Sequence, residues 1–491
     1  MKKLFFTILF SYSTISCFAQ IQWQKCLGGS SFDNGSIIRQ TFDGGYIVAG
    51  TSTSTDGDVT GNHGHEDYWV VKLSASGSIE WEKSYGGSGQ DFATCVQQTS
   101  DSGYIVAGTS TSTDGDVTGN HGLSDYWVLK LSRTGSIQWQ KCLGGRELDV
   151  AESVQQTTDG GYIVVGYSQS FNGDVTGHFG TTPNEDYWVV KLSSTGSIEW
   201  QKCLGGTGLD QGQSVRQTYD GGYIVAGFSG SVDGDVTGNH GGFDYWIVKL
   251  SSVGSIQWQQ SYGGSMNDYA TSIEQTVDSG YIIAGYSSSN DGDVTGNHGY
   301  IDCWIVKLSS SGTLQWQTCL GGSGQDQAVS VQQTTDSGYI IAGGTYSNDD
   351  EVSGNHGTED CWIVKLFHFG SIQWQVCLGG SAQDASGSIQ QTADGGYIVG
   401  AGTFSNDGNI SGNHGNTDYW VVKLDPKTGI DNIANVPPIS IMPNPTTGII
   451  NVKGAGMVNI KVYNTIGQLV KEASNTDNIS ISGYPPGLYL F

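Results

Sequence analysis

Hydrophobic and polar residues follow one pattern that recurs seven times along the chain of 491 residues. Each copy holds an alternating segment such as SIQWQKC, a second segment after GGSxxD, the run GYIVAG and the run DYWVVKL. Short segments rich in β-branched and aromatic residues, separated by turns rich in glycine and aspartate, are typical of strands. The pattern predicts four strands in each copy and an all-β chain.

The copies keep a nearly constant length. Their first tryptophans are Trp23, Trp81, Trp139, Trp200, Trp258, Trp316 and Trp374, at intervals of 58, 58, 61, 58, 58 and 58 residues. A fixed period indicates an array of one supersecondary unit. The last two runs of each copy are apolar on both faces, as expected if each four-stranded antiparallel sheet is covered by its neighbours. Seven such sheets around an axis form a β-propeller.

The two ends of the array complete each other. A lone IQWQKC segment starts at Ile21 and a lone DYWVVKL segment ends at Leu424, and each lacks the hairpin partner that internal copies have. Pairing them would complete the seventh sheet and remove the exposed edges of an open array. An open solenoid is the alternative, but it would need polar caps, which are not visible. We therefore predict a closed seven-bladed propeller over residues 20–425.

One turn recurs in every copy between the second and third predicted strands. It reads Asp43-Gly44-Gly45 in the first copy, with aspartate first, glycine third and glycine or serine between them in all seven. A glycine repeated at the third place predicts that the left-handed residue of a hairpin bulge lies there.

Residues 1–19 have the pattern of a secretory signal. Lys2 and Lys3 precede an apolar run that ends in small residues, and the segment is too short to span a bilayer. Cys17 leaves a lipoprotein signal as an alternative. No later apolar stretch is long enough to cross a membrane. Of the eight remaining cysteines, five share one repeat position with two serines, so we expect mostly free buried thiols instead of disulfides.

The charge of the chain limits its partners. Acidic residues outnumber basic ones 47 to 21, which gives a net charge of −26. This charge argues against nucleic acid, whose phosphates would be repelled. Cations, basic proteins and neutral glycans remain as partners, and solubility alone is the other explanation of the charge.

Two loops of each copy are expected on the same face of the propeller, which we call the top face: the crossover GGSxxD and the longer loop DGDVTGNHG. The crossover aspartates of the seven copies are the predicted binding face: Asp33, Asp91, Asp149, Asp210, Asp268, Asp326 and Asp384. In the longer loop, oxygen donors spaced by one residue around glycine are candidate calcium ligands: Asp56, Asp58, Asp114, Asp116, Asp233, Asp235, Asp291 and Asp293. Turn stabilisation is the alternative role for the loop residues. For the histidine that follows asparagine in six copies, structural hydrogen bonding is expected.

Catalysis requires an acid and a base in different environments. The copies differ little, and the sequence holds no nucleophile elbow, phosphate loop or zinc motif. We therefore expect no enzymatic activity and interpret the propeller as a binding or structural module for a glycan or protein ligand on the top face. A glycan-active hydrolase or lyase with a top-face carboxylate site is the alternative.

Two parts of the chain resemble known families. Over Ile21 to Leu424 the repeat resembles a β-propeller repeat of exported bacterial proteins, a resemblance that implies no particular chemistry. After a linker over residues 426–438, residues 439–491 contain MPNPTTGIINV, VNIKVYNTIGQLVKE and ISGYPPGLYLF. These blocks resemble the C-terminal sorting domain of type IX secretion cargo in Bacteroidetes.

The second resemblance implies a small β-sandwich that the type IX secretion machinery recognises. It also implies a cargo that is released into the medium or held at the outer-membrane surface. The family's domain continues with a few more β residues after Gly-Leu-Tyr-Leu, whereas this sequence stops at Phe491. We therefore expect the last strand to be incomplete.

Overall fold

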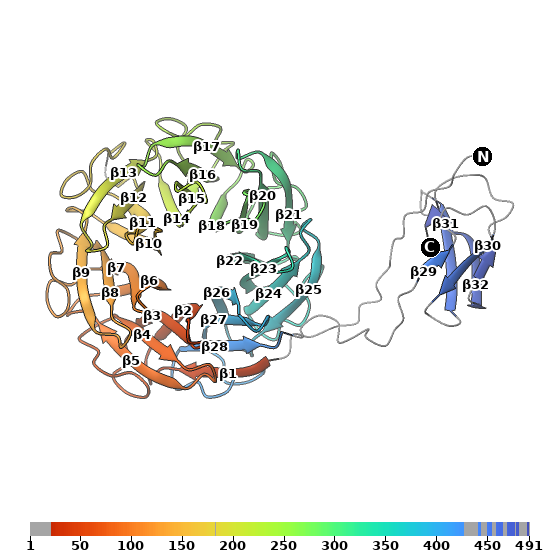
Figure 1. Ribbon diagram of the computed structural model, residues 1–491, viewed down its shortest axis with the longest axis horizontal. Coiled ribbons are helices and arrows are strands. Elements are labelled where there is room, and N and C mark those ends of the chain that lie inside the picture. The colour runs from red at the N-terminus through yellow and green to blue at the C-terminus, as the bar shows by residue number, and fades with distance from the viewer. Residues whose placement is uncertain are drawn as a thin grey trace. The chain divides into compact units, whose positions relative to one another are not determined.

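The strands predicted from the repeated pattern form seven four-stranded antiparallel sheets around an axis in the computed structural model (Figure 1). The structure describes residues 21–181 and 183–426 of the ring, and residues 440–442, 449–453, 458–464, 469–476, 478–480 and 489–490 after it. Among these residues there are strands, turns and loops but no helix. The chain is an all-β protein with a seven-bladed propeller, as predicted.

Four consecutive strands make each of the first six blades. The first three blades contain β2 (Asp33–Gln40), β3 (Tyr46–Ser52), β4 (Asp67–Leu73), β5 (Ile79–Tyr85), β6 (Asp91–Gln98), β7 (Tyr104–Ser110), β8 (Asp125–Leu131), β9 (Ile137–Leu143), β10 (Asp149–Gln156), β11 (Tyr162–Ser168), β12 (Asp186–Leu192) and β13 (Ile198–Leu204). The next three contain β14 (Asp210–Gln217), β15 (Tyr223–Ser229), β16 (Asp244–Leu250), β17 (Ile256–Tyr262), β18 (Asp268–Gln275), β19 (Tyr281–Ser287), β20 (Asp302–Leu308), β21 (Leu314–Leu320), β22 (Asp326–Gln333), β23 (Tyr339–Thr345), β24 (Asp360–Leu366) and β25 (Ile372–Leu378).

The seventh blade closes the ring with strands from both ends of the array. It contains β26 (Asp384–Gln391), β27 (Tyr397–Thr403), β28 (Asp418–Leu424) and β1 (Ile21–Leu27), with β1 antiparallel to β28. Trp420 donates its indole N–H to Gln24 at 3.0 Å, which reproduces the bond between Trp127 and Gln140 inside blade 2. The predicted closure is confirmed.

Each blade is buried on both faces, which explains its continuous apolar runs. All seven residues of β3 and of β4 are buried. The Tyr68 hydroxyl donates to the Trp127 carbonyl of the next blade at 3.0 Å, and the two rings lie 4.6 Å apart. Tryptophan and tyrosine of DYW therefore connect neighbouring blades at five of the seven interfaces, and the core consists of the layers between blades.

The first strand of each blade lines the central channel and the fourth lies on the rim (Figure 1). The crossovers and the β3–β4 loop lie at the top face, where β2 begins. The β2–β3 turn lies at the other end of β2, which we call the bottom face. In this turn the left-handed residue is Gly44 (φ 81°) or the equivalent Ser102 (φ 65°), so the prediction of the third place was wrong. Gly45 is required for a different reason, because a Cβ there would overlap the Leu73 carbonyl.

The residues after the ring form a separate compact unit that begins at Lys427, while the ring unit spans Ala19–Pro426. The second unit contains β29 (Ser440–Met442), β30 (Ile449–Lys453), β31 (Val458–Asn464), β32 (Leu469–Thr476), β33 (Asn478–Ser480) and β34 (Tyr489–Leu490). They pair as two three-stranded sheets, β29-β30-β33 and β32-β31-β34. The predicted sandwich of these sheets stays a prediction.

The predicted signal at 1–19 and all but the first residue of the predicted linker lie outside the described residues. The part of the chain that the structure describes contains no helix that could cross a membrane. The eight cysteines in that part are free thiols, and all except Cys95 are buried.

Candidate functional site

The crossover aspartates are internal and do not form an exposed binding face. Asp91 is 0% exposed. One of its carboxylate oxygens accepts a hydrogen bond from the Ser110 hydroxyl, and the other accepts bonds from the Ser112 hydroxyl at 2.8 Å and the Gly87 N–H at 2.9 Å. The same three donors, with threonine for the first serine in two blades, surround all seven aspartates. They fasten each crossover to the end of the second strand of the blade, such as β7 in blade 2.

The buried environment changes the acidity of these carboxyls. Burial raises the pKa of Asp149 and of Asp268 to about 6, although hydrogen bonds from serine hydroxyls oppose the shift. No ligand can reach a carboxylate with no exposed surface. The prediction of a binding face at these seven residues is therefore corrected to a structural role.

The first aspartate of the longer loop is exposed, but its oxygens already have partners. Asp56 accepts the Ser30 N–H at 2.7 Å and the Ser30 hydroxyl at 2.8 Å, and both bonds lower its pKa. The equivalent Asp or Asn accepts a backbone N–H of the crossover in every blade. This arrangement fits the predicted alternative, in which loop carboxylates stabilise turns.

Asp58 is half-buried, and it accepts a weaker bond from the Gly28 N–H at 3.4 Å. Over residues 21–181 and 183–426, no three His, Cys, Asp or Glu side chains cluster as metal ligands would. Calcium at Asp56 and Asp58 and at the equivalent pairs stays a prediction, which melting experiments with and without calcium would test.

A partly exposed histidine and a buried aspartate form a pair in six blades. His63 donates its backbone N–H to Asp67 at 2.8 Å, and its Nδ1 lies 2.7 Å from the same carboxylate oxygen. The other oxygen of Asp67 has no partner among the described residues, and burial raises the pKa of this carboxyl. In blade 3 the pair is broken, because His178 Nδ1 lies 3.8 Å from Asp186, and burial raises the pKa of Asp186 to about 8. The expected structural role of the histidines is consistent with these bonds.

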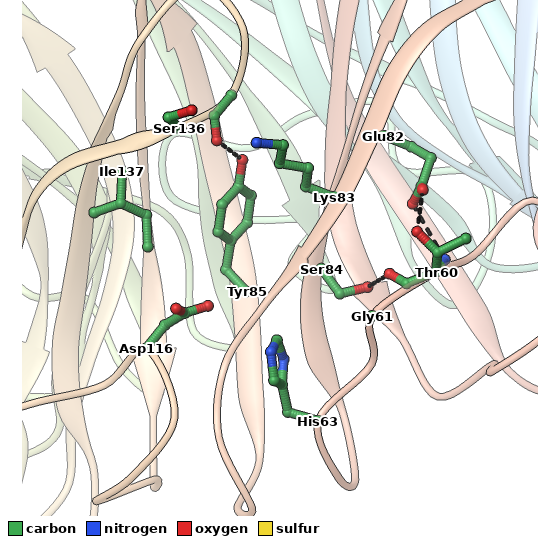
Figure 2. A pocket seen from close by; sticks show the side chains of 11 residues that line it. Thr60, Gly61, His63, Glu82, Lys83, Ser84, Tyr85, Asp116, Ser136 and Ile137 are labelled. Carbon is green, nitrogen blue, oxygen red and sulfur yellow. Dashed lines mark hydrogen bonds between the residues drawn. The ribbon is translucent and has the colours of Figure 1, made fainter.

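An open cleft of about 450 Å³ lies between blades 1 and 2 (Figure 2). Figure 2 shows Tyr85 with its hydroxyl toward Ser136 and the β8–β9 turn, and with its base near His63 and Asp116. The Tyr85 hydroxyl donates to the Gly135 carbonyl, and Glu82 accepts bonds from Thr60 and from the Trp69 indole at 2.8 Å. Thr60, Glu82, Ser84 and Tyr85 thus find their partners within the lining of the cleft.

Glutamines on the channel strands tie the blades together at the bottom face. Gln97 accepts the backbone N–H of Gln156 at 2.8 Å, and Gln98 accepts that of Phe42 at 2.7 Å. The second type of bond occurs in all seven blades. The channel strand is the free edge of each sheet, and these side chains satisfy its N–H groups in place of a neighbouring strand.

The position of Gln97 is where the blades differ in charge. Four blades have glutamine there (Gln97, Gln155, Gln332 and Gln390), and the others have Arg39, Arg216 and Glu274. These residues line a cavity of about 320 Å³ in the channel. We call these seven positions the channel ring.

Sequence reasoning missed the channel ring. An alignment of the segments RQTFDGGY, QQTSDSGY and EQTVDSGY shows the charge change at their first residue. Only the structure shows that the seven positions converge on one cavity.

Comparison with known proteins identifies the C-terminal unit. Residues 440–491 match the Secretion system C-terminal sorting domain. The chain thus joins a seven-bladed propeller to a type IX sorting domain, which implies secretion or a place at the cell surface. No curated protein matches the chain significantly.

Among solved structures, Sqt1 from Chaetomium thermophilum is 11% identical, with a TM-score of 0.41 and coverage of 89% of this chain and 97% of that chain. BamB from Moraxella catarrhalis is 12% identical, with a TM-score of 0.36 and coverage of 84% and 100%. The β-propeller domain of the Trilobed protease from Pyrococcus furiosus is 10% identical, with a TM-score of 0.39 and coverage of 76% and 92%. Likenesses this distant carry no argument about function.

Proposed function

We propose that this protein is an exported binding module without catalytic activity, which holds a glycan or protein ligand outside the cell. The observation that carries the proposal is that the repeated top-face carboxylates are engaged in hydrogen bonds within the protein. Each crossover aspartate accepts three internal hydrogen bonds, and the first aspartate of the longer loop accepts a hydrogen bond from the crossover backbone. Near-identical blades of this kind suit a scaffold that presents surfaces and channels more than one that performs a reaction.

A glycan-active enzyme is less well supported. Glycoside hydrolysis requires two carboxyl groups that flank an accessible bond, one of them with a raised pKa. The carboxyls with raised pKa near the top face include Asp67 and Asp91, which neighbour each other around Gly86, but both are 0% exposed. A polysaccharide cannot enter between them without opening the blade.

The test is a binding and turnover screen on the full chain. A glycan array should give at least one ligand, and incubation with the same glycans should leave them uncleaved. Calcium would be added and chelated in parallel, with the melting temperature as the readout. Release of reducing ends from any polysaccharide would contradict the non-catalytic proposal, and an array without a single bound glycan, together with no captured protein ligand, would contradict the binding role.

A further inference from the structure

The channel ring is rich in hydrogen-bond donors that the protein does not use. Each of the four glutamines accepts a backbone N–H with its side-chain carbonyl, as Gln155 does from Gln217 at 2.6 Å. The other three are Gln97, Gln332 and Gln390. An amide that accepts through its oxygen turns its NH₂ group away from that bond. Within the described propeller, none of these four NH₂ groups has a protein acceptor.

The two arginines add donors and positive charge. Arg39 donates one N–H to the Ile38 carbonyl at 2.8 Å, and Arg216 bonds the Val215 carbonyl at 2.7 Å through one nitrogen. A guanidinium has five N–H donors, so most remain free on each residue. Neither arginine has a carboxylate within ion-pair distance among the described residues.

Arginine also leaves backbone donors open. In five blades the channel ring residue accepts the N–H of the next blade, as Gln390 does from Gln40 at 2.7 Å. Arginine has no acceptor, so the backbone N–H groups of Gln98 and Gln275 have no such side-chain acceptor in the described ring. Each arginine therefore stands beside a backbone N–H that a bound anion can satisfy together with the guanidinium.

Glu274 is the one acidic residue of the channel ring. One of its oxygens accepts the Gln333 N–H at 2.6 Å, and the other has no protein donor in the cavity that Glu274 lines together with two guanidinium groups and four amides. Burial raises the pKa of Glu274, while the charges of Arg216 and Arg39 oppose that shift. The ring carries two positive charges and one negative charge, which suits a monoanion better than a dianion. The free Glu274 oxygen requires a donor such as a hydroxyl on the same ligand.

We propose that the channel ring binds a small carboxylate that also carries hydroxyl groups, such as a sugar acid, with the carboxylate on Arg39 and Arg216 and a hydroxyl on Glu274. Guanidinium groups match carboxylates in shape and charge. A cavity of about 320 Å³ is near the lower end of the size of ligand sites, so it holds a single small molecule and not a polymer. The inference deepens the proposed binding role and places the ligand in the channel toward the bottom face.

The chain itself supplies the variants that test this site. Arg39→Gln and Arg216→Gln introduce the residue that four other blades have, so the fold is retained and the missing bonds to Gln98 and Gln275 are restored. Titration calorimetry of the full chain would compare D-glucuronate with neutral D-glucose and with inorganic phosphate. We expect glucuronate to bind, glucose to bind weakly or not at all, and the double variant to lose about tenfold or more in glucuronate affinity.

Two further variants complete the test. Arg133→Gln removes an exposed charge on the β8–β9 turn and should leave glucuronate binding unchanged. Glu274→Gln should bring phosphate closer to glucuronate in affinity, because the ring then carries two positive charges. Three results would each overturn the site: no glucuronate binding, equal binding of glucose and glucuronate, or unchanged affinity in the double variant. If one of these results is obtained while a glycan from the array still binds independently of Arg39 and Arg216, this site is overturned and the proposed function stands.

Discussion

At the scale of single residues, the aspartates divide into buried ones that the fold depends on and exposed ones that it tolerates losing. Asp91 ends the crossover of blade 2 and Asp114 lies in its longer loop, so both are at the top face. Asp91 has no exposed surface and accepts hydrogen bonds from three donors, whereas Asp114 is exposed and accepts the Ser88 N–H at 2.7 Å. The cost of removing each side chain follows from the donors that it leaves unsatisfied.

The first prediction compares these two aspartates. Asp91→Ala should lower the free energy of unfolding by about 3 kcal/mol, because two hydroxyls and one backbone N–H lose a buried acceptor. Asp114→Ala, the matched control, should cost clearly less because water can replace its carboxylate. Denaturant unfolding of both variants measures the difference. Equal losses would show that burial does not decide the role of these aspartates.

The second prediction concerns pH. The pKa of Asp186 is raised to about 8, so the folded state holds a proton that the unfolded state has released above pH 4. Its contribution is therefore present at low pH and is lost as pH rises toward 8, with a slope of about 1.4 kcal/mol per pH unit. Asp186→Asn should flatten this part of the stability profile between pH 6 and 8.

Asp101 is the control of opposite sign. Although burial raises its pKa, hydrogen bonds from Thr99 and Lys130 lower it to about 2. Its contribution is present above the unfolded pKa and is lost as pH falls below 4, so Asp101→Asn should change the profile only on the acid side. A profile of Asp186→Asn that still falls from pH 6 to 8 with the wild-type slope would contradict the assignment.

Residue types alone predicted the strands but not the roles of these side chains. The aspartate of GGSxxD repeats in every copy, and repetition is equally consistent with a surface and with an internal network. What decides is the pair of hydroxyls at Ser110 and Ser112, which lie about twenty residues later in sequence and beside Asp91 in space. The channel ring could not be predicted from the sequence for a similar reason, because its residues belong to separate blades and come together only in the closed ring.

At the scale of elements, alternation and apolar runs were sufficient to predict the strands of the ring. The apolar and polar residues along a strand follow the burial of that strand, so its own sequence is enough. β4 is apolar on both faces and buried along its whole length, whereas β5 is exposed at its first two residues and buried at its last two. The side-chain bonds between blades leave no such pattern in a single strand. They were therefore found only in the structure.

The third prediction concerns the closing strand β1. Deleting Ile21–Leu27 should lower stability by roughly 5 kcal/mol, at about 1 kcal/mol for each lost ladder bond. It should also expose the edge of β28, which promotes association through edge pairing. Thermal unfolding and light scattering measure the two effects. The control Gln24→Ala removes the bond from Trp420 and the two bonds to Ser411 but leaves β1 in place, so this variant should stay monomeric. A monomeric deletion variant with the wild-type melting temperature would argue against the role of β1.

At the scale of the whole molecule, the propeller and the sorting domain are separate units with separate tasks. The ring closes on itself without strands from the second unit. Transport from the periplasm across the outer membrane should therefore depend on residues 440–491 and be independent of the propeller that precedes them.

The fourth prediction tests this independence. A periplasmic reporter fused to residues 427–491 should reach the cell surface or the medium in a host with a type IX secretion system, while the reporter without this segment should stay in the periplasm. Protease accessibility on whole cells distinguishes the two locations. Retention of the fusion in the periplasm would show that this segment does not suffice for export.

Closure of the ring also sets an order of events for the growing chain. Trp420 and Gln24 are 396 residues apart, whereas the same bond inside blade 2 spans 13 residues. Bringing the distant pair together costs about 3 kcal/mol more in loop entropy, before the intervening blades are allowed to fold and shorten the path. The first strand of the ring to be synthesised is thus the last to find its partner. A product that stops before Asp418 would lack β28 and would keep two open edges. The ring can therefore close only after the seventh blade has been synthesised to its end.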